Sequence, residues 1–410
     1  MNPGSFDRLL TSRAASNLSD GIAIGMLPLL VASVTRSPLL IAIGSVALYL
    51  PWLVVGPAVG MLVDRRSRPG LILMGDGLRA LIFVALALAI LAAPRSAIWL
   101  VPVVAILTGS LEVLSDTAAN AHVPTLEPDE WLERANGRLA GVELVMNALI
   151  GPALGSLLFT VAPALPVFMQ AALMTFGALV VASLPRTPAP ARDDAADAEA
   201  WTDELLAGVR SIRASPTLRL IVPATGLLSF AFGMSAGVLV LHLVENTTFD
   251  EAGYGIVWSV AAIGGTFAAF VMNGLPDRFG RATTLVASAV VIAVSLVFAS
   301  VLGNGWLVAL SFAVLSMGQE LWNIVSVAHR QRVTPDELLG RVGAASRMVA
   351  NGSLPLGGIF AGLLAAALDV GTVIAVAGVV AAFAAALMVP VLGRFRLADN
   401  EIVDLGPAGV

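Results

Sequence analysis

The chain has 410 residues, of which 58% are hydrophobic and 12% are charged, and its mean hydropathy is +0.89. Soluble proteins carry about 25% charged residues, so this composition excludes an ordinary water-soluble or disordered chain. The net charge of −5 argues against nucleic-acid binding. The chain has no cysteine and three scattered histidines, so we expect no disulfide, no metal site and no cofactor.

Apolar segments long enough to cross a bilayer, which takes about 20 residues each, recur along the whole chain. The expected spans are 9–34, 39–63, 70–93, 97–122, 133–160, 164–184, 218–244, 252–274, 282–302, 305–328, 339–366 and 370–393. The first span contains an acid and exceeds the ~7–15 residues of a signal-peptide core, so we do not expect it to be cleaved. The sequence predicts an all-α integral membrane protein with twelve transmembrane helices.

The arginines give the orientation of these helices. With the amino terminus in the cytoplasm, 20 of the 23 arginines lie on the inner side. Because basic residues gather in short cytoplasmic loops, this bias predicts a multi-pass plasma (inner) membrane protein with both termini cytoplasmic.

A change in composition separates two halves of the chain. We expect a six-helix bundle over 1–184, a cytoplasmic linker over 185–217, a second bundle over 218–394 and a cytoplasmic tail over 395–410. Apolar residues between Trp201 and Ile212 fall on one helical face, which predicts an amphipathic helix at the membrane surface. The alternative is a solvated tether.

Short motifs recur on the two sides of the linker. Residues 64–68 (Asp-Arg-Arg-Ser-Arg) match residues 277–281 (Asp-Arg-Phe-Gly-Arg), and Pro-Asp-Glu occurs at 128–130 and 335–337. The second offset, 207, also pairs His122 with His329. Matched pairs in the same order indicate two pseudo-symmetric six-helix repeats, as in transporters built around one central site.

These motifs resemble the major facilitator superfamily. Residues 60–68 are similar to its signature loop, Gly-x-x-x-Asp-Arg-x-Gly-Arg, with Ser67 in place of the second glycine. Residues 144–158 resemble the fifth-helix motif of drug:proton antiporters, with Ser156 in place of a glycine. Four further segments are similar to the branch that contains enterobactin exporters and macrolide efflux pumps: 17–21, 76–80, 132–137 and 215–219. The arginine that many drug antiporters carry in helix four is absent.

The resemblance implies the major facilitator fold, in which helices one, four, seven and ten line the cavity. Asp20 lies in helix one, and Glu112 and Asp116, four residues apart, share a face of helix four. Acids inside a membrane are costly and usually face a wet cavity or a partner, so we expect these three to couple transport to protons. The alternatives are a cationic substrate at Glu112 and Asp116, a solvated Asp116, and a structural Asp20 bonded to Asn17 and Ser16.

Polar, aromatic and flexible apolar residues in helices one, five, seven and ten are candidates for the substrate cavity. They are Asn17, Glu143, Asn147, Phe230, Met234, Gln319, Glu320, Trp322 and Asn323. Gln319 corresponds to Glu112 in the repeat. Ordinary helix packing is the alternative for the apolar members, and Trp322 has lipid as an alternative neighbour.

Two further sets of residues suit the conformational change. A latch between the halves is expected at the repeated acid–arginine loops, with ordinary cytoplasmic arginines as the alternative: Gly60, Asp64, Arg65, Arg68, Asp277, Arg278 and Arg281. Helix hinges or close helix interfaces are expected where glycine and proline recur, with generic packing as the alternative: Gly151, Pro152, Gly155, Pro355 and Gly358.

These observations predict a secondary active transporter, not an enzyme, that exports a small amphipathic molecule by proton antiport and acts as a monomer. A chain without lysine holds no phosphate-binding loop, so the energy must come from a gradient or from the substrate itself. The alternatives are a dedicated siderophore or metabolite exporter and a non-transporting membrane receptor on the same scaffold.

Overall fold

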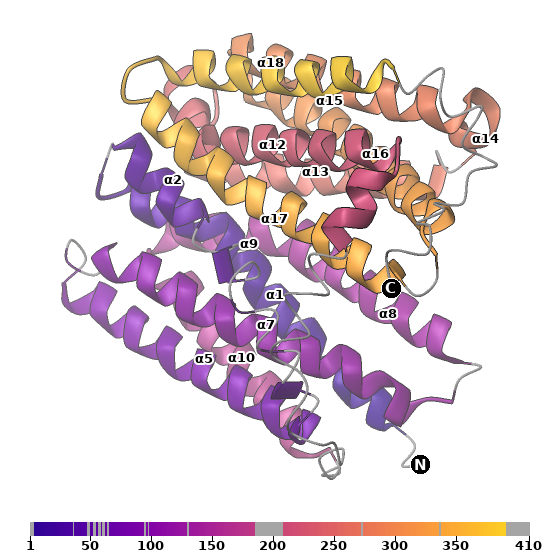
Figure 1. The fold of residues 1–410 in the computed structure, drawn as a ribbon. Coiled ribbons are helices and arrows are strands. Elements are labelled where there is room, and N and C mark those ends of the chain that lie inside the picture. Colours follow the sequence, from indigo (N-terminus) through magenta and orange to yellow (C-terminus); the bar gives the residue numbers. More distant parts are fainter. Residues whose placement is uncertain are drawn as a thin grey trace. The chain divides into compact units, whose positions relative to one another are not determined.

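The computed structural model describes residues 4–35, 37–46, 50–51, 55, 59, 62–63, 65–93, 96, 98–128, 131–184, 208–271, 274–335 and 338–390. Within these ranges the chain is almost wholly helical and contains no strand (Figure 1). Ten of the described helical stretches are long and apolar enough to cross a membrane. The expectation of an all-α integral membrane protein is therefore confirmed.

The chain forms two compact units, the first comprising Met1–Arg192 with Leu239–Ser259 and the second Asp193–Val238 with Val260–Val410. The first unit holds α1 (Ser5–Ala32), α2 (Pro38–Val46), α5 (Arg68–Ala92), η1 (Ile98–Leu100), α7 (Val101–Leu126), α8 (Leu132–Glu143), η3 (Leu144–Ile150), α9 (Gly151–Val161) and α10 (Leu165–Ala182). Two helices, α12 (Leu218–Asn246) and α13 (Glu251–Val271), are divided between the units. The rest of the second unit consists of α14 (Leu275–Phe279), α15 (Arg281–Val301), α16 (Gly305–Val333), α17 (Leu339–Leu364) and α18 (Val370–Met388).

The ten candidate spans coincide with ten of the expected twelve. Of the other two, the expected span 39–63 lies largely outside the described residues, and α2 covers its first part. The other is α17, a 26-residue helix that includes Arg341 and Arg347. The structure is thus consistent with twelve helices.

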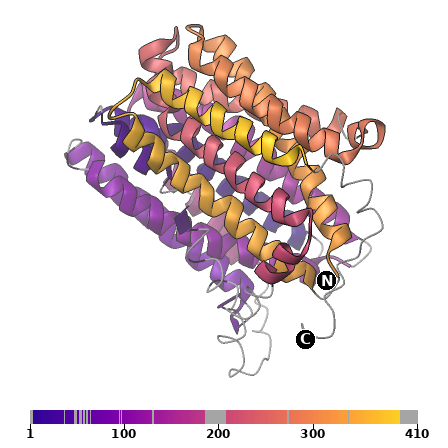
Figure 2. The same cartoon turned by 45° about the horizontal axis from the view of Figure 1, so that its top comes forward.

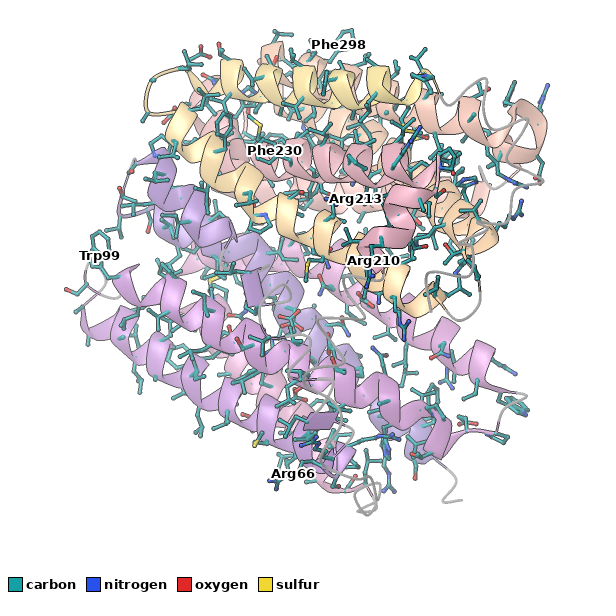
Figure 3. All side chains as sticks on the ribbon, viewed as in Figure 1. Arg66, Trp99, Arg210, Arg213, Phe230 and Phe298 are labelled. Carbon is teal, nitrogen blue, oxygen red and sulfur yellow. The ribbon has the colours of Figure 1, made fainter. Side chains whose placement is uncertain are left out.

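The sequence repeat has a counterpart in the packing within each unit. In the first unit α5 lies against α7 and α10, and in the second unit α15 lies against α16 and α18 (Figures 1 and 2). These are the third helix of each half, packed against the fourth and sixth. Large apolar side chains such as Trp99 and Phe298 project outward with 66% and 58% of their surface exposed (Figure 3). A lipid environment accounts for such exposure, because a bilayer core offers apolar side chains an apolar solvent.

The fifth span contains a π-helical segment, η3, between α8 and α9. Pro152 is the second residue after this segment; it has no N–H to donate and would clash with the carbonyl four residues earlier in a regular α-helix. Widening the turn to a π-helix is one way in which a helix accommodates such a break. The sequence predicts a distortion at Pro152, but it does not specify this form.

The segment expected to link the halves is described only in part. Residues 208–214 are helical, whereas 185–207 and the tail from 391 onward lie outside the described residues. The hairpin Leu239–Ser259, although it follows the linker in sequence, packs in the first unit. There Ser259 Oγ donates to Leu149 O at 2.6 Å, and Ser156 Oγ donates to Ala252 O at 3.2 Å.

Candidate functional site

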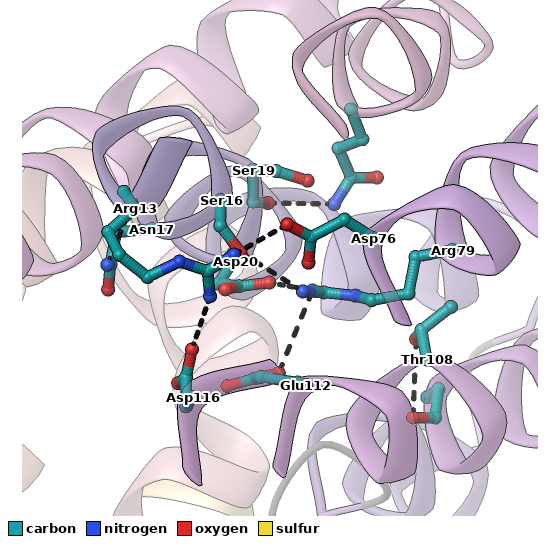
Figure 4. Close-up of polar contacts among 12 residues, drawn as sticks. Arg13, Ser16, Asn17, Ser19, Asp20, Asp76, Arg79, Thr108, Glu112 and Asp116 are labelled. Atoms are coloured by element: carbon teal, nitrogen blue, oxygen red, sulfur yellow. Dashed lines mark hydrogen bonds and ion pairs between the residues drawn. The ribbon is translucent and has the colours of Figure 1, made fainter. Parts of the chain in front are cut away.

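Three helices of the first unit bring six charged side chains together in its interior (Figure 4). Each of α1, α5 and α7 contributes two of them, spaced seven, three and four residues apart, so that each pair shares a helix face. We call this set the charge cluster, and its members are Arg13, Asp20, Asp76, Arg79, Glu112 and Asp116.

Arg13 of α1 joins the other two helices on one side of the cluster. Its Nη2 lies 2.5 Å from Asp76 Oδ2 on α5, and its Nη1 lies 2.8 Å from Asp116 Oδ1 on α7. Arg13 and Asp76 are 3% and 0% exposed, whereas Asp116 is 25% exposed. These three residues form the Arg13 triad.

Arg79 of α5 joins the other two helices on the other side of the cluster. Its Nη2 forms an ion pair with Asp20 Oδ1 on α1 and lies 3.8 Å from Glu112 Oε2 on α7, while Nη1 donates to Ser16 Oγ at 3.3 Å. Arg79 and Asp20 are 2% and 7% exposed, and Glu112 is 19% exposed. These residues, Arg79, Asp20 and Glu112, form the Arg79 triad.

The two triads have the same composition. Each has a central arginine, one deeply buried aspartate and one partly exposed acid on α7. The cluster therefore contains two guanidinium groups and four carboxyl groups. An unpaired buried charge is costly, so each arginine stabilises the acids beside it.

Sequence reasoning singled out Asp20, Glu112 and Asp116, and the structure brings all three together. It did not identify Arg13, Asp76 and Arg79 as their partners. The arginines that pair with the acids of α7 lie on α1 and α5. The only sequence signal was the pair Asp76 and Arg79, which are intramembrane charges three residues apart on one face.

The structural alternative for Asp20 named the wrong partners. Ser16 Oγ accepts from Arg79, and Asn17 Nδ2 donates to Arg13 O at 2.9 Å, so both side chains are engaged elsewhere. Asp20 instead pairs with Arg79. The acid is held by a neighbouring helix and not by the polar residues of its own helix.

Glycines allow α1 to lie directly on the distorted fifth span. A Cβ at Gly21 would collide with the backbone of Asn147 and Gly151, and one at Gly25 with the backbone of Pro152. One at Gly155 would collide with the backbone of Ile22. The expected interface residues Gly151, Pro152 and Gly155 thus contact the helix that carries Arg13 and Asp20.

The second unit has a similar close approach. Gly233 of α12 faces the backbone of Leu354, and Gly357 of α17 faces the backbone of Phe230. Pro355 and Gly358, which were expected at this interface, are buried in α17 beside these contacts.

The residues expected in a substrate cavity are divided between the units. Asn17, Glu143 and Asn147 lie in the first unit, and the other six lie in the second. Glu143 ends α8, within electrostatic range of Asp116. Asn147 lies in η3, where its backbone contacts Gly21.

In the second unit, two of the expected cavity residues are fully packed. Met234 is 0% exposed and Trp322 is 2% exposed, and Trp322 Nε1 donates to Thr225 Oγ1 at 3.0 Å. The suggestion that Trp322 faces lipid is therefore wrong. Phe230 is partly buried and its ring centroid lies 5.7 Å from that of Phe360. Gln319 and Glu320 are half-buried, and Asn323 is exposed.

The expected latch is described only in part, because Gly60 and Asp64 lie outside the described residues. Arg65 precedes Arg68, which begins α5; Asp277 and Arg278 lie in α14, and Arg281 begins α15. Gly280 has a φ of +83°, which favours glycine, whereas Ser67 at the matching position has a φ of −59°. The serine in the first copy of the motif is accommodated because its backbone does not need glycine.

Comparisons with known proteins agree with this architecture. The family model described as transmembrane secretion effector matches residues 3–408. Macrolide efflux protein A of Streptococcus pyogenes is 22% identical over 340 residues, which cover 81% of this chain and 82% of that protein. An uncharacterized MFS-type transporter of Sinorhizobium fredii, y4rN, is 25% identical over 381 residues, with 88% of each protein covered.

Solved transporter structures share the fold. A peptide transporter POT in complex with sulfate matches with a TM-score of 0.75 at 13% identity, covering 97% of this chain and 96% of that one. A bacterial homologue of the iron transporter ferroportin, in an inward-facing state, matches with a TM-score of 0.73 at 13% identity, covering 95% and 99%. At such low identity these likenesses show the fold alone.

Proposed function

We propose a function from one premise: the chain belongs to the transmembrane secretion effector family of the major facilitator superfamily. It is thus a multi-pass membrane transporter of the efflux class, with small molecules as its cargo. Within that class, we propose that it exports a small amphipathic molecule across the inner membrane in exchange for protons, by alternating access, as a monomer.

The charge cluster is the observation that carries this proposal. Asp20, Glu112 and Asp116 serve as the proton-coupling acids, and Arg13 and Arg79 hold them in place. An acid that can lose its proton needs a compensating cation nearby, and each arginine supplies one. The partly exposed acids of α7 give protons access, while the buried aspartates lie behind them.

The substrate is assigned to a cavity with apolar and amide walls. Phe230 supplies apolar surface, Asn17, Asn147, Gln319 and Asn323 supply amides, and Glu143 and Glu320 add acids. Met234 and Trp322, which are buried in the described structure, contribute only as packing. Such a mixture suits an amphipathic molecule, because ligand sites are mostly apolar with a few polar groups that fix orientation.

The conformational change is assigned to the repeated loops and the glycine interfaces. Asp64 with Arg65 and Arg68, and Asp277 with Arg278 and Arg281, act as the latch, together with Gly60. The hinges lie where Gly151, Pro152 and Gly155 meet α1 and where Pro355 and Gly358 interrupt α17. Both termini and the linker 185–217 are placed in the cytoplasm, and reporter fusions at Asp193 and after Val410 test this.

A transport assay tests the antiport. Because two of its relatives are macrolide efflux proteins, the probe is erythromycin, offered to inside-out vesicles with an imposed pH gradient. We expect proton-driven uptake by the wild type. Asp20→Asn and Glu112→Gln keep the side-chain shape but remove the titratable proton, so each should abolish uphill uptake while retaining some macrolide binding.

The matched control is Glu245→Gln, the same chemical change at an exposed acid near the end of α12 and outside the charge cluster. It should transport like the wild type at equal protein content. Wild-type coupling in both Asp20→Asn and Glu112→Gln would show that neither acid is individually required as the proton site. No macrolide movement by the wild type would exclude this substrate.

A further inference from the structure

A small cavity lies in the first unit where three of its candidate spans end. It has a volume of about 220 Å³ and is lined by residues from the start of α1, the end of α7 and the first two turns of α8. Its charged and aromatic lining residues are Phe6, Asp7, Glu127, Trp131, Arg134 and Arg138. Sites for drug-sized molecules are typically about 300–1,000 Å³, so this cavity suits a small polar group and not the whole exported molecule.

The ends of the helices place this cavity at a boundary between membrane and water. The candidate span of α1 begins at Ser5, that of α7 ends at Leu126 and the fifth span begins at Arg134. Trp131, which is 49% exposed, is a residue type that gathers at membrane–water boundaries. Lipid headgroups occupy this layer, so a headgroup is the small polar group that reaches the cavity.

Two arginines one helical turn apart on α8 give the cavity a basic side. The guanidinium of Arg134 lies over the Trp131 ring at 5.2 Å, and that of Arg138 lies over the Phe6 ring at 5.1 Å. Stacking leaves the N–H donors at the edge of each guanidinium available, apart from the contact of Arg138 Nη2 with Asp7 Oδ1 at 2.8 Å. Because a guanidinium matches the oxygens of a phosphate, this side of the cavity suits a phosphate group.

The same cavity also has an acidic side. Glu127 follows the last residue of α7, and within the described structure neither Glu127 nor Arg134 has an ion-pair partner. They line one cavity and do not pair with each other. A purely anionic headgroup would place its charge beside Glu127, whereas a headgroup with a phosphate and an ammonium group suits both residues. A primary ammonium donates hydrogen bonds to a carboxylate, and a quaternary ammonium has no N–H to donate.

We propose that this cavity binds the headgroup of phosphatidylethanolamine, with its phosphate against Arg134 and Arg138 and its ammonium against Glu127. The lipid thereby joins the end of α7 to the start of α8. In the proposed topology it belongs to the inner leaflet. The site shares no residue with the charge cluster, so the inference depends neither on the exported molecule nor on the coupling ion.

Native mass spectrometry of the purified full-length chain in detergent tests this site. The probes are phosphatidylethanolamine, phosphatidylcholine and phosphatidylglycerol with identical acyl chains. We expect the wild type to bind phosphatidylethanolamine about tenfold more tightly than the other two, which is the effect of one hydrogen bond between charged groups. Equal binding of the three lipids would overturn the proposal.

Two variants separate the acidic side from the basic side. Glu127→Gln should remove the preference for phosphatidylethanolamine over phosphatidylglycerol, because the ammonium loses its carboxylate. Arg134→Gln should weaken the binding of all three lipids by about tenfold, because each carries a phosphate. The matched controls are Glu245→Gln and Arg213→Gln, the same changes at exposed residues outside the cavity, and they should bind lipid like the wild type.

An unchanged lipid preference in Glu127→Gln, or an unchanged affinity in Arg134→Gln, would contradict the assignment. If Arg134→Gln does not fold, Arg138→Gln takes its place. Free phosphoethanolamine, added as a competitor, identifies the source of the headgroup. We expect it not to displace the lipid at equal concentration; displacement would show a site for a soluble zwitterion and would refute the lipid site. The assay contains neither a transported molecule nor a pH gradient, so its outcome is independent of the antiport test.

Discussion

The interior of the first unit is charged, whereas the matching helices of the second unit are joined by neutral hydrogen bonds. In place of α1, α5 and α7, the second half of the chain has α12, α15 and α16. Between residues 220 and 244 of α12 and 282 and 301 of α15 there is no Asp, Glu or Arg. Trp322 Nε1 donates to Thr225 at 3.0 Å, and His329 Nε2 lies 2.8 Å from Thr217 Oγ1.

The sequence repeat shows which positions of the two halves differ in charge. The offset of 207 pairs Glu112 with Gln319 and Asp116 with Asn323, so α16 carries the amide counterpart of each acid of α7. One architecture thus accommodates either an acid or its amide on the same helix face. The proposed proton coupling therefore relies on acids of the first half, while close glycine contacts between the first and fifth helices occur in both halves.

The largest effect is expected from Arg79→Gln. It leaves Asp20 buried without its cation, and breaking a buried ion pair costs about 3–5 kcal/mol. We expect a large fall in the free energy of unfolding, measured by thermal denaturation of the purified protein. The double variant Asp20→Asn with Arg79→Gln should recover part of it, and Arg213→Gln, at an exposed arginine, should change little. Wild-type stability of Arg79→Gln would contradict the role of this pair.

A smaller effect, similar in the two units, is expected at the glycine contacts. Gly25→Ala and Gly233→Ala each force two helix backbones apart, and overpacking of this kind costs about 1–3 kcal/mol. Gly77→Ala is the control, because the described structure leaves open space there. As a helix-interior change it should stabilise by up to about 1 kcal/mol. A loss of stability in one unit alone would break the structural equivalence of the halves.

The charge difference itself is tested by Gln319→Glu, which places the acid of α7 on α16. The side chain is half-buried, and an acid lacking an arginine partner there should cost on the order of 1 kcal/mol at neutral pH. The loss should shrink in acid, because the protonated group carries no charge. Melting temperatures at neutral and acidic pH measure both effects. No loss at either pH would show that the second unit tolerates an acid as readily as the first.

The smallest effects concern two helix caps in the second unit. Asn304 caps α16 by accepting from Trp306 N at 2.9 Å, and Asn304→Ala should cost about 1 kcal/mol at any pH. Asp369 caps α18, and hydrogen bonds from the Thr372 side chain and backbone lower the pKa of its exposed carboxyl group.

The two caps therefore differ in their pH dependence. With a lowered folded-state pKa, Asp369 stabilises the protein above the pKa of the unfolded chain, and this contribution is lost as the pH falls through the folded value. The deficit of Asp369→Ala should vanish in acid, whereas that of Asn304→Ala should persist. Melting curves of both variants across the pH range provide the check, and a pH-independent deficit at Asp369 would contradict the charged cap.

The sequence identified three acids of the candidate site, but it did not identify their ion-pair partners or show which side chains are buried. Asp20, Glu112 and Asp116 stand out because an acid in an apolar segment is conspicuous by itself. Their partners do not stand out, because Arg13 lies near the amino-terminal end of its span, where the predicted orientation leads one to expect an arginine in any case. The sequence also did not show which side chains are buried. It allows Trp322 to face either lipid or protein, and its hydrogen bond to Thr225 shows that it faces protein.

By itself the sequence determined the helical class, ten of the span positions, the internal repeat and the family, because hydropathy and short motifs are local properties. It also placed Glu112 and Asp116 on one face, since a spacing of four follows from the helical turn. Only the tertiary structure decided which charges pair. Arg13 and Asp76 are 63 residues apart, Asp20 and Arg79 are 59 apart, and Arg13 and Asp116 are 103 apart. Which helices become neighbours depends on how their glycines and side chains fit together, and no local periodicity encodes that fit.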